Sequence, residues 1–190
     1  MSFEQSLAVE PSARLKESYP TKDGRLIHVT PIGREHLLAH PSVIPLLDEA
    51  IAQVELPTDG SSSMTQVDLN RPLEKTSSVE TTDIGLDGEA WFSQRLNRRG
   101  ATHVVLEGTD SMTSTVVIIA RPAATSPEKY ILRTAYIGML AENEPWTPTN
   151  DIAAQAKAQA FWSTHALVYD ETHMGKPFRS TWRQVLERAR

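Results

Sequence analysis

Tyr130-Ile-Leu-Arg-Thr-Ala-Tyr-Ile137 and the earlier run Thr115-Val-Val-Ile-Ile-Ala120 decide the fold class of this 190-residue chain. Both runs are rich in β-branched and aromatic residues, which favour strands. The earlier run is apolar on both faces, which indicates a central strand. A third strand is predicted at His103-Val-Val-Leu106, with loop-length connections that suit hairpins. We therefore expect a mainly antiparallel sheet over residues 103–137.

Helices are predicted on both sides of these strands. Pro31 to His40 is typical of a helix with Thr30 as its N-cap. A second helix begins near Ser42, because apolar residues recur at helical spacing over 43–54. Further helices are expected at 89–99, at 150–164 and at 181–190. The predicted fold class is α+β, with N-terminal helices packed on a mainly antiparallel sheet and with C-terminal helices.

The composition favours a cytoplasmic protein with a single core. We expect an N-terminal arm over 1–24, one α+β domain over 25–170 and a basic helical tail over 171–190. The chain has no cysteine, which excludes disulfides and thiolate metal sites. No apolar run approaches the roughly 20 residues that cross a bilayer, and the start of the chain is acidic where a secretory signal is basic. No membrane contact is therefore predicted.

Nucleic-acid binding requires a local basic patch, because the net charge of −5 repels a polyanion. The predicted helix over 89–99 offers one. Trp91, Arg95, Arg98 and Arg99 would share a side, and an aromatic ring with guanidinium groups is typical of single-strand binding. The alternative is a solvated face whose arginines complement the helix carboxyl end. His103 follows closely, either as an acid or base beside a bound phosphate or as a surface residue.

The strand over 130–137 places side chains on two faces, because alternate residues of a strand point in opposite directions. Thr134 and Tyr136 would share the even-numbered face, and Arg133 would lie on the odd-numbered face with three apolar residues. If helices cover the apolar face, Thr134 and Tyr136 look into an open face where a site could be built. This alternation argues against a catalytic set that uses both Arg133 and Thr134.

A histidine pair raises the question of a metal site. His36 and His40 are four residues apart and would face the same way on a helix. A zincin requires glutamate directly after the first histidine, where this chain has Leu37, and no third ligand stands at family spacing. We expect no metal and no cofactor. The alternatives are a helix-end role for His40 and a solvated or half-buried position for His36. His165, at a helix end, is predicted to be a packed residue.

Several segments carry a resemblance to known proteins. Over about residues 25–170 the chain resembles an uncharacterised family of chiefly actinobacterial proteins. The segments concerned are Ile27-His-Val-Thr-Pro-Ile-Gly-Arg-Glu-His36, Ser93-Gln-Arg-Leu-Asn-Arg-Arg-Gly100, Thr113-Ser-Thr-Val-Val-Ile-Ile119, Leu132-Arg-Thr-Ala-Tyr-Ile-Gly138 and Phe161-Trp-Ser-Thr-His-Ala-Leu167. The helix-first layout, with a sheet that contains Thr-Ala-Tyr, is also similar to the barnase, colicin and RelE-like ribonuclease fold.

The ribonuclease likeness implies a function and a set of site residues. Such enzymes are hydrolases that cut RNA without metal. The resemblance implies His36 as the base, Arg98 or Arg95 as the phosphate clamp, and Thr134 and Tyr136 as contacts from the sheet face. The net negative charge of this chain departs from the usual basic character of ribonuclease toxins. The alternative is therefore an inactive relative.

Two functions are therefore expected from the sequence. The first is a metal-independent ribonuclease or ribonuclease-like toxin domain, whose partners would be RNA and a protein antitoxin. The second is a non-catalytic protein-interaction or regulatory module, whose exposed Trp146 or Trp182 would contact a protein partner.

Overall fold

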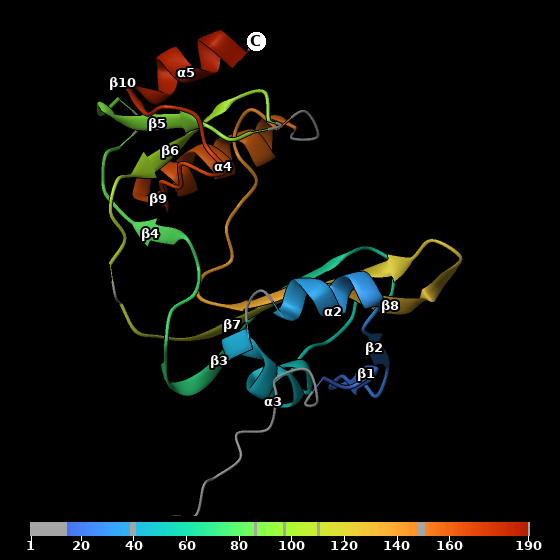
Figure 1. The fold of residues 1–190 in the computed structure, drawn as a ribbon. Coiled ribbons are helices and arrows are strands. Elements are labelled where there is room, and N and C mark those ends of the chain that lie inside the picture. The colour runs from blue at the N-terminus through green and yellow to red at the C-terminus, as the bar shows by residue number, and fades with distance from the viewer. Residues whose placement is uncertain are drawn as a thin grey trace, which may run out of the picture. The chain divides into compact units, whose positions relative to one another are not determined.

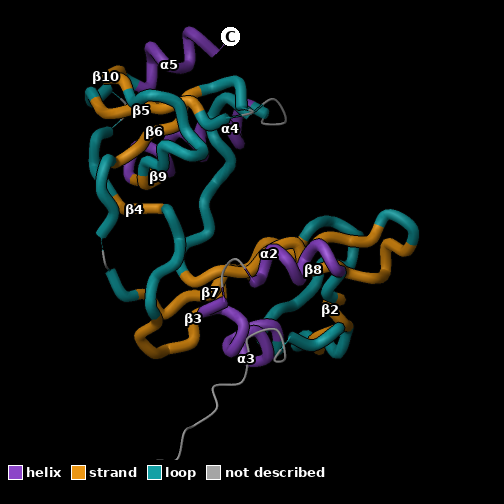
Figure 2. The backbone as a smooth tube through the Cα atoms, viewed as in Figure 1, coloured by secondary structure: helices purple, strands orange, loops and turns teal. Residues whose placement is uncertain are grey.

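The computed structural model describes residues 15–38, 41–85, 87–96, 98–109, 111–147 and 151–189. The chain forms two compact units, each built on one five-stranded sheet (Figures 1 and 2). The first unit comprises Met1–Ser77 and Ser111–Leu140, and the second comprises Ser78–Asp110 and Ala141–Arg190. The expected boundaries at residues 24 and 170 fall inside these units.

The first unit contains the two runs that decide the fold class. Its strand order is β1-β2-β8-β7-β3, in which only β2 and β8 pair in parallel. The strands are β1 (Ser18–Pro20), β2 (Leu26–His28), β3 (Ser63–Leu73), β7 (Thr113–Ala123) and β8 (Ser126–Ile137). The apolar run of β7 lies between β8 and β3, so its prediction as an inner strand is confirmed.

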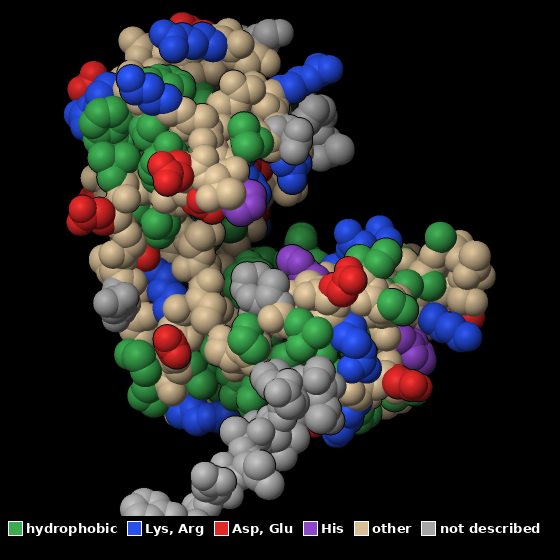
Figure 3. All heavy atoms as spheres, in the orientation of Figure 1, with side chains coloured by type: hydrophobic (Ala, Val, Ile, Leu, Met, Phe, Trp, Pro, Cys, Tyr) green, Lys and Arg blue, Asp and Glu red, His purple; other side chains and the backbone are tan. Residues whose placement is uncertain are grey.

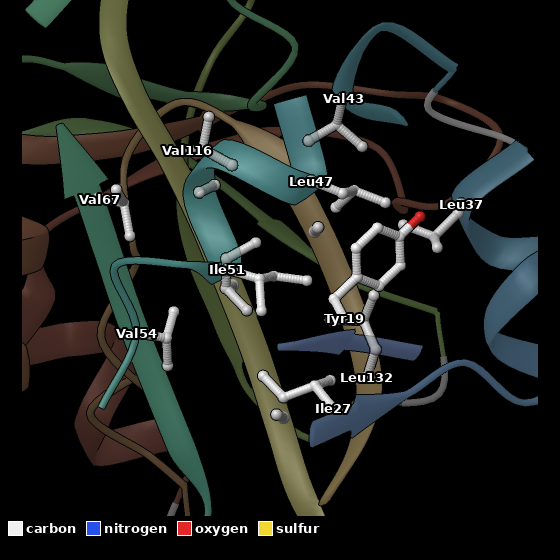
Figure 4. Packing of buried hydrophobic residues seen from close by; sticks show 14 of the residues in the cluster. Tyr19, Ile27, Leu37, Val43, Leu47, Ile51, Val54, Val67, Val116 and Leu132 are labelled. Atoms are coloured by element: carbon white, nitrogen blue, oxygen red, sulfur yellow. The ribbon is translucent and has the colours of Figure 1, made fainter. Parts of the chain in front are cut away.

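One face of this sheet is covered by short helices that carry the predicted apolar stripe. These are α2 (Pro31–Leu38), the 3-10 helix η1 (Pro41–Leu46) and α3 (Leu47–Ile51). The side chains of Val43, Leu47 and Ile51 are fully buried against the sheet (Figure 4). Burying each contributes roughly 1.5–3 kcal/mol of hydrophobic stabilisation.

The second unit is built around aromatic side chains. Its strand order is β10-β5-β6-β9-β4, in which only β6 and β9 pair in parallel. The elements are β4 (Val79–Thr81), β5 (Ala90–Gln94), β6 (Ala101–Val105), α4 (Ile152–Thr164), β9 (His165–Val168), β10 (Phe178–Ser180) and α5 (Trp182–Ala189). Phe92 packs edge-on against Trp182, whose indole N–H donates to the carbonyl of Trp162 at 3.1 Å. This aromatic cluster is the core of the second unit.

The α+β fold class is confirmed, but the expected arrangement is wrong in two respects. The described residues form two mixed sheets in place of one mainly antiparallel sheet, and the helices are spread along the chain. The predicted strand at 103–106 pairs within the second sheet, so it forms no hairpin with β7. It pairs instead with β5 and β9, and nothing in the sequence pattern indicates these partners.

The predicted helix over 89–99 is also wrong. Residues 90–94 form β5, which pairs with β6 on one side and with β10 on the other. Pairing on both edges satisfies the backbone hydrogen-bonding groups of β5. The burial of Phe92 between two neighbouring strands outweighs the local preference for a helix.

The two helices predicted in the C-terminal part of the chain are confirmed in type. α4 begins after its N-cap Asp151, whose carboxylate accepts the backbone N–H of Ala154 at 2.7 Å. α5 corresponds to the predicted tail helix. Among the helices of the described residues, none combines the length and apolarity that a membrane crossing requires.

Candidate functional site

An open pocket of about 700 Å³ lies in the first unit, between α2 and the strands β7 and β8. Its apolar side includes Pro31, Ile32 and Ile131. Its polar side includes the four side chains that could carry chemistry, His36, Arg121, Arg133 and Thr134. Pockets of this size take small ligands or part of a larger one. We call it the His36 pocket.

Helix α2 is held against β8 by a close backbone contact. The parallel partner β2 ends at His28, and α2 then lies beside the next part of β8. The backbone N–H of Gly33 donates to the Thr30 hydroxyl at 3.1 Å, which confirms Thr30 as the N-cap. A Cβ atom on Gly33 would stand 3.0 Å from the carbonyl oxygen of Leu132. A residue without a side chain therefore lets α2 approach β8 closely enough for His36 to reach the sheet.

A β-bulge in β8 determines which side chains face the pocket. Ile119 of β7 pairs with Thr134, and the next residue of β7 pairs with Leu132, so Arg133 has no partner in the ladder. The extra residue reverses the alternation, as bulges do. Leu132 and Ala135 consequently both lie in the core, and Thr134 lies on the open side with Ile131.

The bulge overturns the argument from strict alternation. That argument separated Arg133 from Thr134 and placed Leu132 with Thr134. In the structure both Arg133 and Thr134 line the pocket, and Leu132 is 1% exposed in the core. A bulge depends on the neighbouring strand, so the sequence of β8 alone carries no signal for it.

His36 and Thr134 are in direct contact. The imidazole Nε2 lies 2.9 Å from the Thr134 hydroxyl oxygen, at a sequence separation of 98 residues. His36 is exposed on α2, and Thr134 is half-buried on β8. When the imidazole carries its proton on Nδ1, the threonine hydroxyl donates to Nε2. The structure thus brings together two of the four predicted catalytic residues.

The two pocket arginines form no ion pair with any carboxylate that the structure describes. Five other arginines each pair with a carboxylate: Arg25, Arg71, Arg95, Arg179 and Arg183. Among the described residues, no ion pair and no side-chain hydrogen bond involves the guanidinium group of Arg121 or Arg133. Two guanidinium groups beside an imidazole make the pocket suited to an anion.

Tyr136 lies on the same side of β8 as Thr134 but does not line the pocket. Its hydroxyl donates to the carbonyl of Met139 at 3.3 Å, within the segment that follows β8. The hydroxyl therefore anchors the chain after the strand, and we assign it no part in the pocket.

The predicted basic face of Trp91, Arg95, Arg98 and Arg99 does not form, because its helix is absent. These residues belong to the second unit, on β5 and on the turn that follows it. Arg179 lies over the Trp91 ring at 5.4 Å, and Arg95 pairs with the buried carboxylate of Glu144 at 2.9 Å. Arg98 and Arg99 are exposed in the turn. Trp91 and Arg95 thus have partners of their own, and only Arg98 and Arg99 share the exposed turn.

His103 is a core residue of the second unit. It is 1% exposed, and its Nδ1 donates to the carbonyl oxygens of His165 at 2.8 Å and of Trp162 at 3.2 Å. Burial lowers the pKa of His103 below its ordinary value, against the opposing effect of these two hydrogen bonds. An imidazole held in this way has no access to a phosphate, so we assign His103 to packing. His165 stacks on Phe161 with ring centres 4.1 Å apart, as a packed residue does.

The tryptophans expected on the surface are covered. Trp182 is 1% exposed, and Trp146 is half-buried with its indole N–H donating to the carbonyl of Ala101 at 2.9 Å. His40 lies outside the described residues, so the predicted histidine pair is not seen. Within the described ranges, no three His, Asp or Glu side chains gather closely enough to hold a metal ion.

The charge distribution fits a local site better than a continuous binding surface. On the face drawn in Figure 3, the described Lys and Arg side chains are interspersed with Asp and Glu. Comparison with protein families, with curated proteins and with solved structures finds no match for this chain. The candidate function therefore rests on the residues of the pocket.

Proposed function

We propose that the first unit binds a phosphate group of single-stranded RNA in the His36 pocket and cleaves the RNA without a metal ion. The observation that supports the proposal is the His36–Thr134 contact of 2.9 Å in a pocket that is also lined by two guanidinium groups. An acid–base group beside concentrated positive charge is what phosphodiester cleavage requires. In a cytoplasmic setting, such a domain would act on cellular RNA, and a toxin of this kind would need a protein antitoxin.

His36 acts as the base in the proposed reaction. It takes the proton from the ribose 2′-hydroxyl while the 2′-oxygen forms a bond to phosphorus and the bond from phosphorus to the 5′-oxygen breaks. The products are a 2′,3′-cyclic phosphate and a 5′-hydroxyl, and the leaving oxygen takes its proton from water in the open pocket. Thr134 orients the imidazole and then turns its hydroxyl to a phosphate oxygen.

Arg121 and Arg133 replace the predicted clamp of Arg95 and Arg98 in this account. Charge on the phosphate oxygens increases as the 2′-oxygen attacks, and the two guanidinium groups offset that charge. Arg95 is already committed to Glu144, and Arg98 belongs to the second unit. The apolar side of the pocket, with Ile32 exposed to 75%, offers a surface for the adjoining base.

The direct test is cleavage of a mixed RNA pool by the purified full chain in excess EDTA. We expect the wild type to cleave RNA, and His36→Ala to lose about 10²- to 10⁴-fold in rate, which is the usual contribution of a general base. His173→Ala is the matched control, because this exposed histidine lies in the second unit.

Two results would contradict the proposal. Cleavage by His36→Ala at the wild-type rate would remove His36 as the base. Equal cleavage of an all-deoxy substrate would exclude attack by the 2′-hydroxyl. An RNA pool that every variant leaves intact would instead favour the non-catalytic interaction module. Its contact surface would then lie elsewhere than at Trp182, which is buried, or Trp146, which is half-buried.

A further inference from the structure

A second pocket, of about 210 Å³, lies wholly within the second unit. It is bounded by the turn between β5 and β6, by the start of β10 and by the last turns of α5. We propose that this pocket binds a small organic anion that has a carboxylate group on a short apolar body. The proposal is independent of the ribonuclease function, because the two pockets share no residue.

The turn between β5 and β6 is fixed beside this pocket by Trp146. A Cβ atom on Gly100 would stand 2.3 Å from the Trp146 ring, so glycine is needed where the ring packs against the turn. The indole N–H donates to the carbonyl of Ala101, the next residue of the chain. Since Gly100 and Ala101 both line the pocket, its wall is anchored by a large side chain.

Two guanidinium groups line this pocket. Arg99 extends from the turn, and Arg188 comes from α5 and lies over the Phe178 ring at 6.0 Å. In the same unit, Arg95, Arg179 and Arg183 all pair with carboxylates and lie outside the pocket lining. Among the described side chains, no carboxylate forms an ion pair with Arg99 or Arg188. Two guanidinium groups of the unit that form no described ion pair therefore meet at its pocket.

The remaining walls determine the class of ligand. Phe178, Val185 and Ala189 supply apolar surface beside the two cations. A planar guanidinium pairs with a carboxylate through two parallel hydrogen bonds, and the apolar wall favours a hydrocarbon or aromatic body over a bare inorganic ion. The small volume limits that body to about the size of a single ring.

Titration of the full chain with benzoate, followed by calorimetry and by NMR, tests this proposal. We expect benzoate to bind about tenfold or more tightly than benzamide, its neutral counterpart, because only benzoate pairs with the guanidinium groups. Arg99→Gln and Arg188→Gln should each weaken benzoate binding by about tenfold or more. Arg183→Gln should leave it unchanged, since Arg183 lies on α5 outside the pocket and pairs with Asp87.

Three results would overturn the proposal. These are benzoate binding no tighter than benzamide, equal weakening by Arg183→Gln, and NMR shifts that avoid the pocket residues. Arg99→Lys controls for a folding defect, because lysine keeps the positive charge but cannot form the two parallel hydrogen bonds of a guanidinium group. We expect it to bind benzoate more tightly than Arg99→Gln and less tightly than the wild type.

Discussion

Single residues in this chain have roles that their neighbours in sequence do not reveal. His103 lies beside the arginine-rich turn in sequence, yet its ring is enclosed in the second unit and bonded to the carbonyls of Trp162 and His165. Arg133, by contrast, stands in an apolar run and reaches a pocket. The ribonuclease resemblance implied His36 and Thr134 as members of one site, and the two side chains are in contact.

The burial of His103 makes the stability of the second unit depend on pH. Because burial lowers its pKa in the folded state, the unfolded chain binds a proton first as the pH falls. The contribution to stability is therefore complete above about pH 6.5, the ordinary histidine value, and is lost below it. In His103→Asn, which keeps a donor but does not titrate, we expect that part of the pH dependence to disappear. Urea unfolding between pH 5 and 8 measures it, and an unchanged slope would contradict the assignment.

Elements were predicted well where the pattern is local and poorly where it depends on a partner. Thr30 and the stripe over 43–54 signal their helices through neighbouring residues alone, and both are confirmed. The segment that forms β5 was expected to be helical, although it pairs with a strand on each side. The bulge at Arg133 depends on the register with β7, so strict alternation misplaced the pocket arginine.

A substitution at Gly33 tests whether the close contact between α2 and β8 positions His36 in the pocket. Alanine is favoured over glycine inside a helix by about 1 kcal/mol, so an unconstrained site would be stabilised by the change. Here the added Cβ meets the Leu132 carbonyl of the sheet at 3.0 Å, and we expect Gly33→Ala to lower stability and to slow RNA cleavage by displacing His36. Urea unfolding and cleavage rates check this, with the exposed Glu35→Ala as the control. A gain in stability at unchanged activity would show that α2 is not tightly packed there.

At the scale of the whole molecule, each of the two units has a pocket that is lined by two arginines. Arg121 and Arg133 line the pocket of the first unit, and Arg99 and Arg188 line that of the second. The sequence gives no sign of this division, because the second unit is assembled from segments on both sides of residues 111–140. Phosphate chemistry is thus assigned to the first unit alone, although Arg95 and Arg98, the clamp residues that the resemblance implied, lie in the second unit.

The most direct test of this assignment compares two double variants in the RNA cleavage assay with excess EDTA. Arg121→Gln with Arg133→Gln should reduce the cleavage rate by about a hundredfold or more, because both groups that offset the phosphate charge are removed. Arg98→Gln with Arg99→Gln should cleave at a rate close to that of the wild type. The opposite pattern, with activity lost only in the Arg98 and Arg99 pair, would contradict the account and return the phosphate clamp to the second unit.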